Sequence, residues 1–255
     1  MSDARRSPRD WAALLRDNWE ERSRSEQRDF YVASHRGWRN PERWLAQAEN
    51  DARLMLYQVD RSALSGWNVL EIGCGVGRLA TPLSPLVASY TGVDIAPGMV
   101  EEAHRRSSAL ANVRFFVSDG IGLPDDVDDR RYELVIALAV FIHCPRDVIA
   151  ALVRAGFERL TPGGELRFQV LADPTDPTGL SSLEEATAAH DEIQEMEEGA
   201  TQDERELIDG HYYMGDAFRY GELEPFLVEA SGGVGRVTLI RPDLAHVYGW
   251  VARPR

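Results

Sequence analysis

The stretch VLEIGCGVGRLA, residues 69–80, decides how the chain folds. It begins with the apolar residues of a buried strand, passes through three glycines and continues into a helix. A glycine-rich turn between a strand and a helix lets a ligand approach the backbone closely and offers it the free amides of the helix N-terminus. The stretch therefore predicts a cofactor site at the end of the first strand of an α/β fold.

Two classes of cofactor use such a turn. Dinucleotide-binding folds require the spacing Gly-x-Gly-x-x-Gly, which would place a glycine where this chain has Arg78. The spacing here is Gly-x-Gly-x-Gly, with Glu71 two residues before the first glycine. This departure argues against a nicotinamide dinucleotide, and a nucleotide-binding fold for some other ligand remains the alternative.

Short β-rich runs alternate with helical stretches on both sides of the turn. The predicted strands are 69–72, 90–93, 113–117, 134–138, 166–171, 237–240 and 247–252. Helices are expected near residues 83, 102 and 151 and over 222–230, whereas the Pro- and Asp-rich segment 123–131 is predicted to be a loop. Strand and helix alternating in this way specify a parallel sheet with right-handed crossovers.

Residues 1–64 are predicted to form a helical cap before the main domain, residues 65–255. One helix starts at Ser7, which is followed by proline and by an acid three positions later, and another starts at Asn40. The residues that keep helical spacing on one face are Trp11, Leu14, Leu15 and Trp19 in the first helix, and Trp44, Ala48, Met55 and Val59 in the second.

A helical insertion is predicted over 173–215, where the alternation stops at a Pro- and Asp-rich break. Two capping boxes, Ser182 with Glu185 and Thr201 with Glu204, open short helices in it. The insertion is strongly acidic, which could favour a cationic ligand, although such charge runs usually form a solvated helix face. We expect it to close as a lid over the carboxyl edge of the sheet.

Composition limits the possible functions. The net charge of −14 repels phosphate backbones, which argues against a nucleic-acid partner. The longest apolar run is too short to span a bilayer and the start is polar, so we expect a cytoplasmic protein without a membrane partner. Two cysteines, Cys74 and Cys144, are too few for a disulfide scaffold or a thiolate zinc site, and no metal is expected.

Four further motifs follow the glycine turn in order. Asp94 ends the second strand, 21 residues after Gly73, and Asp119 stands in the sequence FVSDG. YELVI at 132–136 is followed by FIHCP, and the stretch LTPGGEL begins at residue 160. Together these motifs resemble class I S-adenosylmethionine-dependent methyltransferases of the small-molecule type, similar to methyltransferase types 11 and 25.

The resemblance implies a Rossmann-like, doubly wound α/β fold whose seven-stranded sheet ends in an antiparallel strand. S-adenosylmethionine would be the cofactor and S-adenosylhomocysteine the product. The residues implied to bind it are Glu71, Gly73, Cys74, Gly75, Gly77, Asp94, Ile95, Ser118, Asp119, Gly120 and Leu138. Asp94 would hold the ribose hydroxyls and Asp119 the adenine amino group.

The resemblance also implies methyl transfer to an oxygen or nitrogen of a small-molecule acceptor. His143 follows the fourth strand and is the candidate general base, or else a packing residue beside the cofactor. Aromatic residues that could wall the acceptor pocket are Tyr31, Trp38, Tyr212 and Tyr213. Alternatives are an RNA or protein methyltransferase and a catalytically silent cofactor-binding subunit; we expect a monomer or a homodimer.

Overall fold

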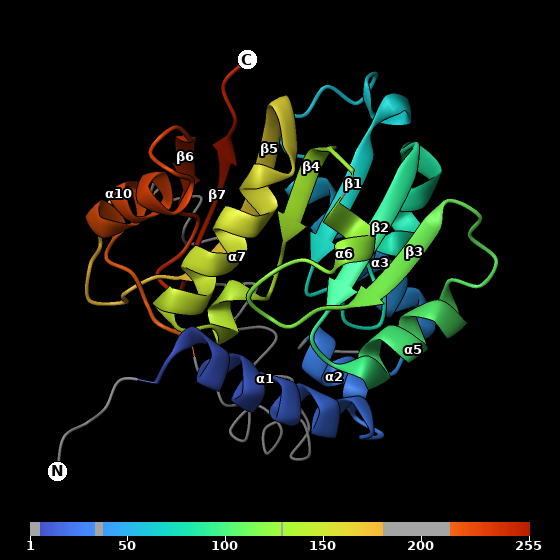
Figure 1. The fold of residues 1–255 in the computed structure, drawn as a ribbon. Coiled ribbons are helices and arrows are strands. Elements are labelled where there is room, and N and C mark those ends of the chain that lie inside the picture. Colours follow the sequence, from blue (N-terminus) through green and yellow to red (C-terminus); the bar gives the residue numbers. More distant parts are fainter. Residues whose placement is uncertain (1–5, 34–37, 129, 181–214) are drawn as a thin grey trace, which may run out of the picture.

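The structure is a computed structural model that describes residues 6–33, 38–128, 130–180 and 215–255. Its centre is a seven-stranded sheet with the strand order β3-β2-β1-β4-β5-β7-β6 (Figure 1). The strands are β1 (Asn68–Ile72), β2 (Ser89–Asp94), β3 (Val113–Val117), β4 (Tyr132–Ala137), β5 (Leu160–Leu171), β6 (Arg236–Ile240) and β7 (His246–Ala252). The first five are parallel, and β7 runs antiparallel to both β5 and β6. The predicted fold class is thus confirmed.

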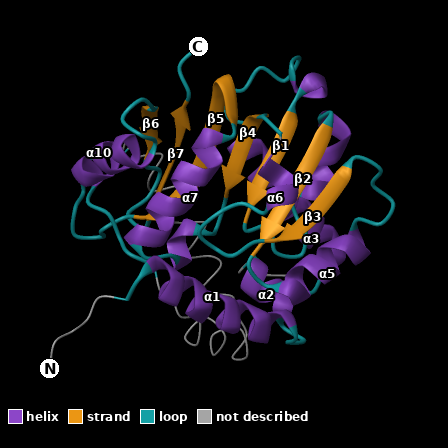
Figure 2. Ribbon diagram, in the orientation of Figure 1, coloured by secondary structure: helices purple, strands orange, loops and turns teal. Residues whose placement is uncertain are grey.

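Helices cover both faces of the sheet (Figure 2). They are α1 (Pro8–Ser23), α2 (Arg28–Val32), α3 (Pro41–Met55), α4 (Ala80–Leu83), α5 (Pro97–Arg106), α6 (Asp125–Asp128), α7 (Arg146–Glu158) and α10 (Tyr220–Ala230). Three short 3-10 turns add to them, of which η3 (Phe141–His143) matters for the site. Segment 123–131, predicted to be a loop, contains α6, because the fully buried side chain of Val127 anchors a turn there.

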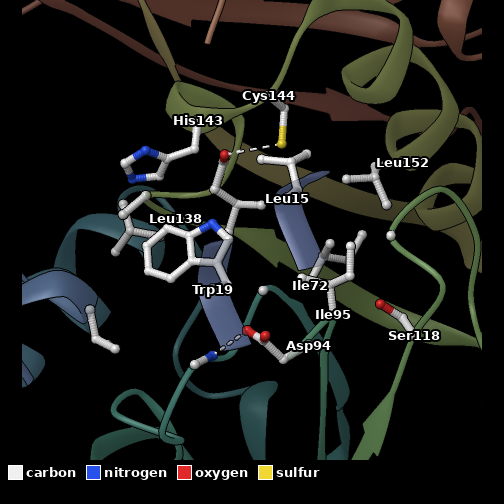
Figure 3. A pocket seen from close by; sticks show the side chains of 16 residues that line it. Leu15, Trp19, Ile72, Asp94, Ile95, Ser118, Leu138, His143, Cys144 and Leu152 are labelled. Atoms are coloured by element: carbon white, nitrogen blue, oxygen red, sulfur yellow. Dashed lines mark hydrogen bonds between the residues drawn. The ribbon is translucent and has the colours of Figure 1, made fainter. Parts of the chain in front are cut away.

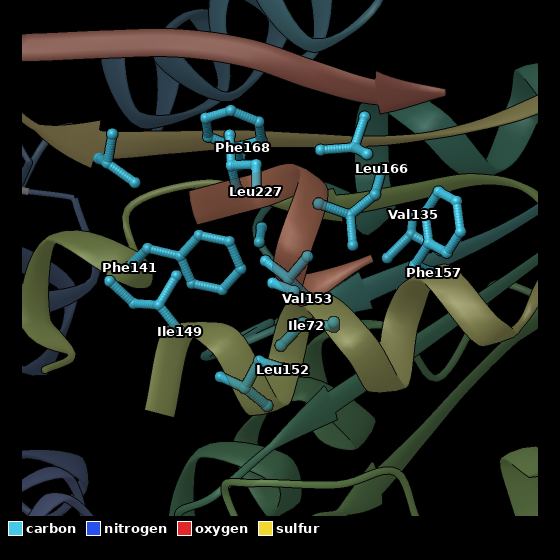
Figure 4. Packing of buried hydrophobic residues seen from close by; sticks show 14 of the residues in the cluster. Ile72, Val135, Phe141, Ile149, Leu152, Val153, Phe157, Leu166, Phe168 and Leu227 are labelled. Carbon is cyan, nitrogen blue, oxygen red and sulfur yellow. The ribbon is translucent and has the colours of Figure 1, made fainter. Parts of the chain in front are cut away.

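Alternate residues of the central strands pack on opposite faces. In β4, Val135 and Ala137 belong to the hydrophobic cluster of α7 and α10, whereas Leu134 and Ile136 belong to that of α3 and α4. Figure 4 shows the first cluster, in which side chains of β5 and α7 interdigitate. Strands buried on both faces read as continuous apolar runs, which explains why the sequence revealed them clearly.

Helix α1 lies across the edge at which the parallel strands end (Figure 1). It begins as predicted: the Ser7 hydroxyl accepts a hydrogen bond from the Asp10 amide at 3.3 Å, and both halves of the capping box are present. Leu15 belongs to the α7-side cluster, so α1 packs on the core of the main domain. The prediction was wrong at Leu14, which is 40% exposed. The buried face of α1 contains Leu15, as predicted, together with Ala12.

The second predicted helix, α3, packs through Ala52 and Met55 on the α4 side of the sheet. It ends at Met55, so Val59 lies beyond it, in contrast to the prediction. Within the described residues, no helix combines the length and apolarity that crossing a membrane requires.

Most of the predicted insertion, residues 181–214, lies outside the described residues, and with it both predicted capping boxes. Its beginning is held by Arg241, a fully buried side chain that donates to the carbonyl oxygens of Thr178 at 2.7 Å and Asp173 at 3.1 Å. After the insertion, the carboxylate of Asp216 accepts from the Arg146 amide at 2.8 Å. The described ends of the insertion are therefore fixed to the main domain.

Candidate functional site

A cavity opens at the carboxyl ends of β1, β2 and β4 (Figure 3). Its empty space amounts to about 690 Å³, a volume that includes solvent at the open side. Its lining residues are Leu15, Trp19, Val32, Ile72, Gly73, Gly75, Asp94, Ile95, Ser118, Gly120, Leu138, Ala139, Val140, His143, Cys144 and Leu152. The position agrees with the rule that open α/β sheets bind ligands beyond the carboxyl ends of their strands.

The glycine turn forms one wall of the cavity with bare backbone. Gly73 and Gly75 have φ angles of 71° and 50°, a region that side chains with a Cβ rarely adopt. A Cβ on Gly73 would lie 2.3 Å from Cγ2 of Val140, so the turn and the loop after β4 are in close contact. The sequence therefore needs glycine here both for its conformation and for space.

Asp94 joins the end of β2 to the glycine turn. One carboxylate oxygen accepts from the Gly75 amide at 2.8 Å, drawn as a dashed line in Figure 3, and the other accepts from the Ala96 amide at 2.9 Å. Burial raises the pKa of this carboxyl, while the backbone hydrogen bonds lower it. A carboxylate has about four acceptor positions. Asp94 can thus hold the turn and still offer an acceptor to a ligand.

Glu71 points away from the cavity, because it alternates along β1 with Leu70 and Ile72. Its buried carboxyl accepts a hydrogen bond from the phenol of Tyr90. Burial raises the pKa of Glu71 to about 8; Arg78 opposes the shift, and the carboxylates of Asp94 and Asp51 add to it. The Glu71 side chain thus supports the turn from behind and does not line the cavity.

We predict that Glu71 makes stability depend on pH. The folded protein keeps this proton up to about pH 8, whereas the unfolded chain releases it near the ordinary value of 4.5. Between these limits the folded state binds more protons, so the free energy of unfolding falls as pH rises. Urea unfolding should show the wild type losing about 1 kcal/mol more than Glu71→Gln from pH 6 to 7. Parallel curves for the two proteins would contradict the shift.

His143 lies in η3, directly after the loop that follows β4. Its ring is 5% exposed and meets the ring of Trp19 edge-on, with centroids 5.1 Å apart. Trp19, from α1, therefore lies next to the predicted general base (Figure 3). The arrangement places a titratable ring and a large aromatic surface on the same wall.

The two cysteines are buried thiols. Burial raises the pKa of Cys144 to about 12 and that of Cys74 well above its usual value. Cys144 donates to the carbonyl oxygen of Val140 at 3.3 Å, which helps to close the loop. Among the described residues, no group of three or more histidines, cysteines and acids is arranged to hold a metal ion.

Some predicted site residues lie outside the cavity lining. Besides Glu71 these are Cys74, Gly77, Asp119, Tyr31 and Trp38. Asp119 is exposed, and its Oδ1 accepts from the amides of Ile121 at 3.0 Å and Gly122 at 2.7 Å. It borders a separate hollow next to Arg9 and Arg16 of α1.

The two aromatic residues predicted near the N-terminus pack among other side chains. Trp38 is 7% exposed, and its ring lies 6.0 Å from that of Phe30. The guanidinium of Arg22 lies over the ring of Tyr31, 5.0 Å from the ring centre. Tyr212 and Tyr213 fall outside the described residues.

Several residues that line the cavity were not predicted from the sequence, among them Leu15, Trp19, Val32, Ala139 and Val140. Trp19 and Leu15 were recognised as one face of a helix. Helical spacing shows which face is buried but not what it is buried against. Nothing in the sequence connects Val32 with the glycine turn. In the structure the two are in contact, because a Cβ on Gly75 would lie 3.2 Å from the Val32 side chain.

Known proteins match both the sequence and the fold. A family model described as a methyltransferase domain matches residues 69–164. The chain is 26% identical over 144 residues to a ubiquinone biosynthesis O-methyltransferase of Pseudomonas fluorescens strain Pf-5, an alignment that covers 56% of this chain. It spans 60% of the length of that curated relative.

Two crystal structures share the fold over nearly the whole chain. Magnesium protoporphyrin IX methyltransferase from Synechocystis PCC 6803, with S-adenosylhomocysteine bound, has a TM-score of 0.59 at 18% identity, covering 94% of this chain and 99% of that one. The N-methyltransferase NodS from Bradyrhizobium japonicum WM9, in complex with the same compound, has a TM-score of 0.56 at 16% identity and covers 94% and 98%. At these identities the likeness concerns the fold.

Proposed function

We propose that this chain, whose residues 69–164 match a family model described as a methyltransferase domain, is a class I S-adenosylmethionine-dependent methyltransferase that transfers a methyl group to an oxygen or nitrogen atom of a small molecule. One observation carries the proposal: Asp94 and the Gly73–Gly75 backbone meet at a single cavity, joined by a hydrogen bond of 2.8 Å. We infer that this acid binds the ribose hydroxyls, beside a backbone that a ligand can touch.

The residues present fit the cofactor S-adenosylmethionine. The acceptor positions that remain on Asp94 suit the hydroxyls of a ribose, and the Gly73 and Gly75 backbone that lines the cavity would face the amino-acid end. Ile95, Ser118 and Gly120 line the side of the cavity that would hold the adenine. When bound, the cofactor supplies a methyl group that is already electrophilic, because it is attached to a positively charged sulfur.

The protein then has two tasks, alignment and exclusion of water. Trp19, Leu138 and Val140 give the cavity an apolar wall against which an acceptor can be oriented. A hydroxyl or protonated amine must lose a proton in the reaction, and we propose that His143, which lines the cavity beside Trp19, takes it. Cys144 stays a neutral thiol because of its raised pKa and does not compete.

A small acceptor is supported by the cover and by the charge. Leu15 and Trp19 of α1 and Val32 of α2 close over the strand ends, which leaves a cavity rather than a flat face. A net charge of −14 is unsuited to docking a nucleic acid. The curated relative is named as an O-methyltransferase and NodS as an N-methyltransferase, so we propose both atoms as possible targets.

Calorimetry tests the proposal directly. We predict that the protein binds S-adenosylhomocysteine and shows no comparable affinity for NAD, because Arg78 occupies the position where dinucleotide folds need glycine. S-adenosylmethionine with a labelled methyl group, incubated with a panel of phenols and amines, then identifies the acceptor class. Binding of NAD more tightly than S-adenosylhomocysteine would overturn the proposal.

A further inference from the structure

Ala139 stands out in the loop after β4. Its φ angle is 56°, so it adopts the left-handed conformation that is unfavourable for every residue with a Cβ. Non-glycine residues persist in this region only where their surroundings impose it, and such positions cluster at active sites. Ala139 lines the cavity, between Leu138 and Val140, so the strain lies in the wall that leads to His143.

Gln169 on β5 forms a hydrogen bond with this strained residue. The ladder between β4 and β5 ends at the pair Ala137 and Phe168. One residue further along β5, the side-chain oxygen of Gln169 accepts a hydrogen bond from the Ala139 amide at 3.1 Å. The Gln169 side chain thus provides a hydrogen bond to the β4 side just beyond the last backbone pair.

The orientation of the Gln169 amide is fixed from its other side. A backbone amide can only donate, so the oxygen of Gln169 must face Ala139 and its nitrogen must face the opposite way. There the nitrogen donates to the phenol oxygen of Tyr248 at 3.0 Å. Tyr248 is the direct cross-strand partner of Gln169 on β7. Burial raises the pKa of this phenol, which therefore remains neutral.

We propose that Gln169 is a positioning residue that holds Ala139 in its left-handed conformation and thereby sets the pocket wall from Leu138 to His143. Two contacts depend on this setting. Val140 packs against Gly73 so closely that a Cβ on the glycine would lie 2.3 Å from it. The carbonyl oxygen of Val140 accepts from the His143 amide at 3.0 Å and from the Cys144 thiol at 3.3 Å.

These two hydrogen bonds, from Tyr248 through Gln169 to Ala139, therefore connect the antiparallel strand β7 to the cofactor side of the cavity. This inference rests on the proposed function, because it assigns the wall to the cofactor and the acceptor. Gln169 is 7% exposed and does not line the cavity, so it acts through the loop.

The test measures binding of S-adenosylhomocysteine by calorimetry in four variants. Gln169→Leu keeps the volume but removes the acceptor, and we expect the dissociation constant to rise about tenfold. Gln169→Glu keeps an acceptor for the Ala139 amide, and we expect a rise of less than threefold. Ala139→Gly alone is the reference for the double variant, because glycine adopts the left-handed region without strain and without the hydrogen bond.

The double variant, Ala139→Gly with Gln169→Leu, is the decisive one. If the hydrogen bond serves to hold a strained residue, glycine removes the need for it, and the double variant should bind within threefold of Ala139→Gly alone. Loss of packing alone would leave the double variant as weak as Gln169→Leu, and this result would overturn the inference. Thermal unfolding of every variant separates misfolding from a change in the loop.

The outcome for the wild type separates the two proposals. A wild-type protein that does not bind S-adenosylhomocysteine contradicts the proposed function. A wild type that binds it, together with a Gln169→Leu variant that binds equally well, contradicts only the role of Gln169.

Discussion

Replacing Asp94 by alanine is expected to weaken the binding of S-adenosylhomocysteine by about 2 kcal/mol or more, which corresponds to roughly 30-fold in the dissociation constant. Two effects add in the same direction. The variant loses a charged acceptor for the ribose hydroxyls. It also leaves the amides of Gly75 and Ala96 without the carboxylate oxygens that they now contact at 2.8 and 2.9 Å.

One further variant separates these effects, and another serves as a control. Asp94→Asn keeps the shape and one acceptor oxygen, so it should hold one of the two amides and fall between the wild type and Asp94→Ala. Asp147→Asn removes an exposed carboxylate on α7, away from the cavity lining, and should leave affinity unchanged. Isothermal titration of all four proteins gives the comparison. Equal affinity in the wild type and Asp94→Ala would show that the ribose is held elsewhere.

The strands could be predicted well because their signal is local. Each of the seven runs predicted from the sequence overlaps an observed strand, and the largest difference is at β5, which starts at Leu160 and not at 166. The extra residues contain Pro162 and two glycines, which weaken a strand pattern even where the backbone stays extended. Pairing with β7 continues to Glu165. Beyond this pair, the Gly163 amide donates a hydrogen bond to the carbonyl oxygen of Arg253.

Side-chain direction was harder to predict than position. Residues 70 and 72 of β1 face α7, so the period of two alone sends Glu71 to the other face, where Tyr90 meets it. The resemblance to a family suggested a direct contact with the cofactor instead. For Asp119 no local signal existed, because whether its oxygens face a ligand or the amides of Ile121 and Gly122 depends on the loop conformation.

The cover of the site depends on contacts between distant parts of the chain. Trp19 and His143 are far apart in sequence, and only the position of α1 across the strand ends brings their rings to 5.1 Å. Gln169 gave no signal either, since a lone glutamine in an apolar strand reads as an exposed position. Its importance follows from the φ angle of Ala139, which a sequence does not reveal.

Replacing Gly73 by alanine should have a still larger effect, which we expect to exceed a hundredfold loss of affinity for S-adenosylhomocysteine. The left-handed conformation at φ 71° costs a residue with a Cβ about 1–2 kcal/mol. In addition, the new methyl group would lie 2.3 Å from Cγ2 of Val140. Either the turn or the loop after β4 must move, and both line the cavity.

The matched control is Gly66→Ala, at a position where a Cβ meets no atom within 4 Å. It should leave both affinity and thermal stability close to those of the wild type. A second variant tests the cause: adding Val140→Ala to Gly73→Ala removes the overlapping methyl groups but leaves the backbone strain. We expect this double variant to regain part of the lost affinity, as measured by calorimetry. If Gly73→Ala bound S-adenosylhomocysteine as the wild type does, the cofactor could not pass along this turn, and the binding mode proposed here would be wrong.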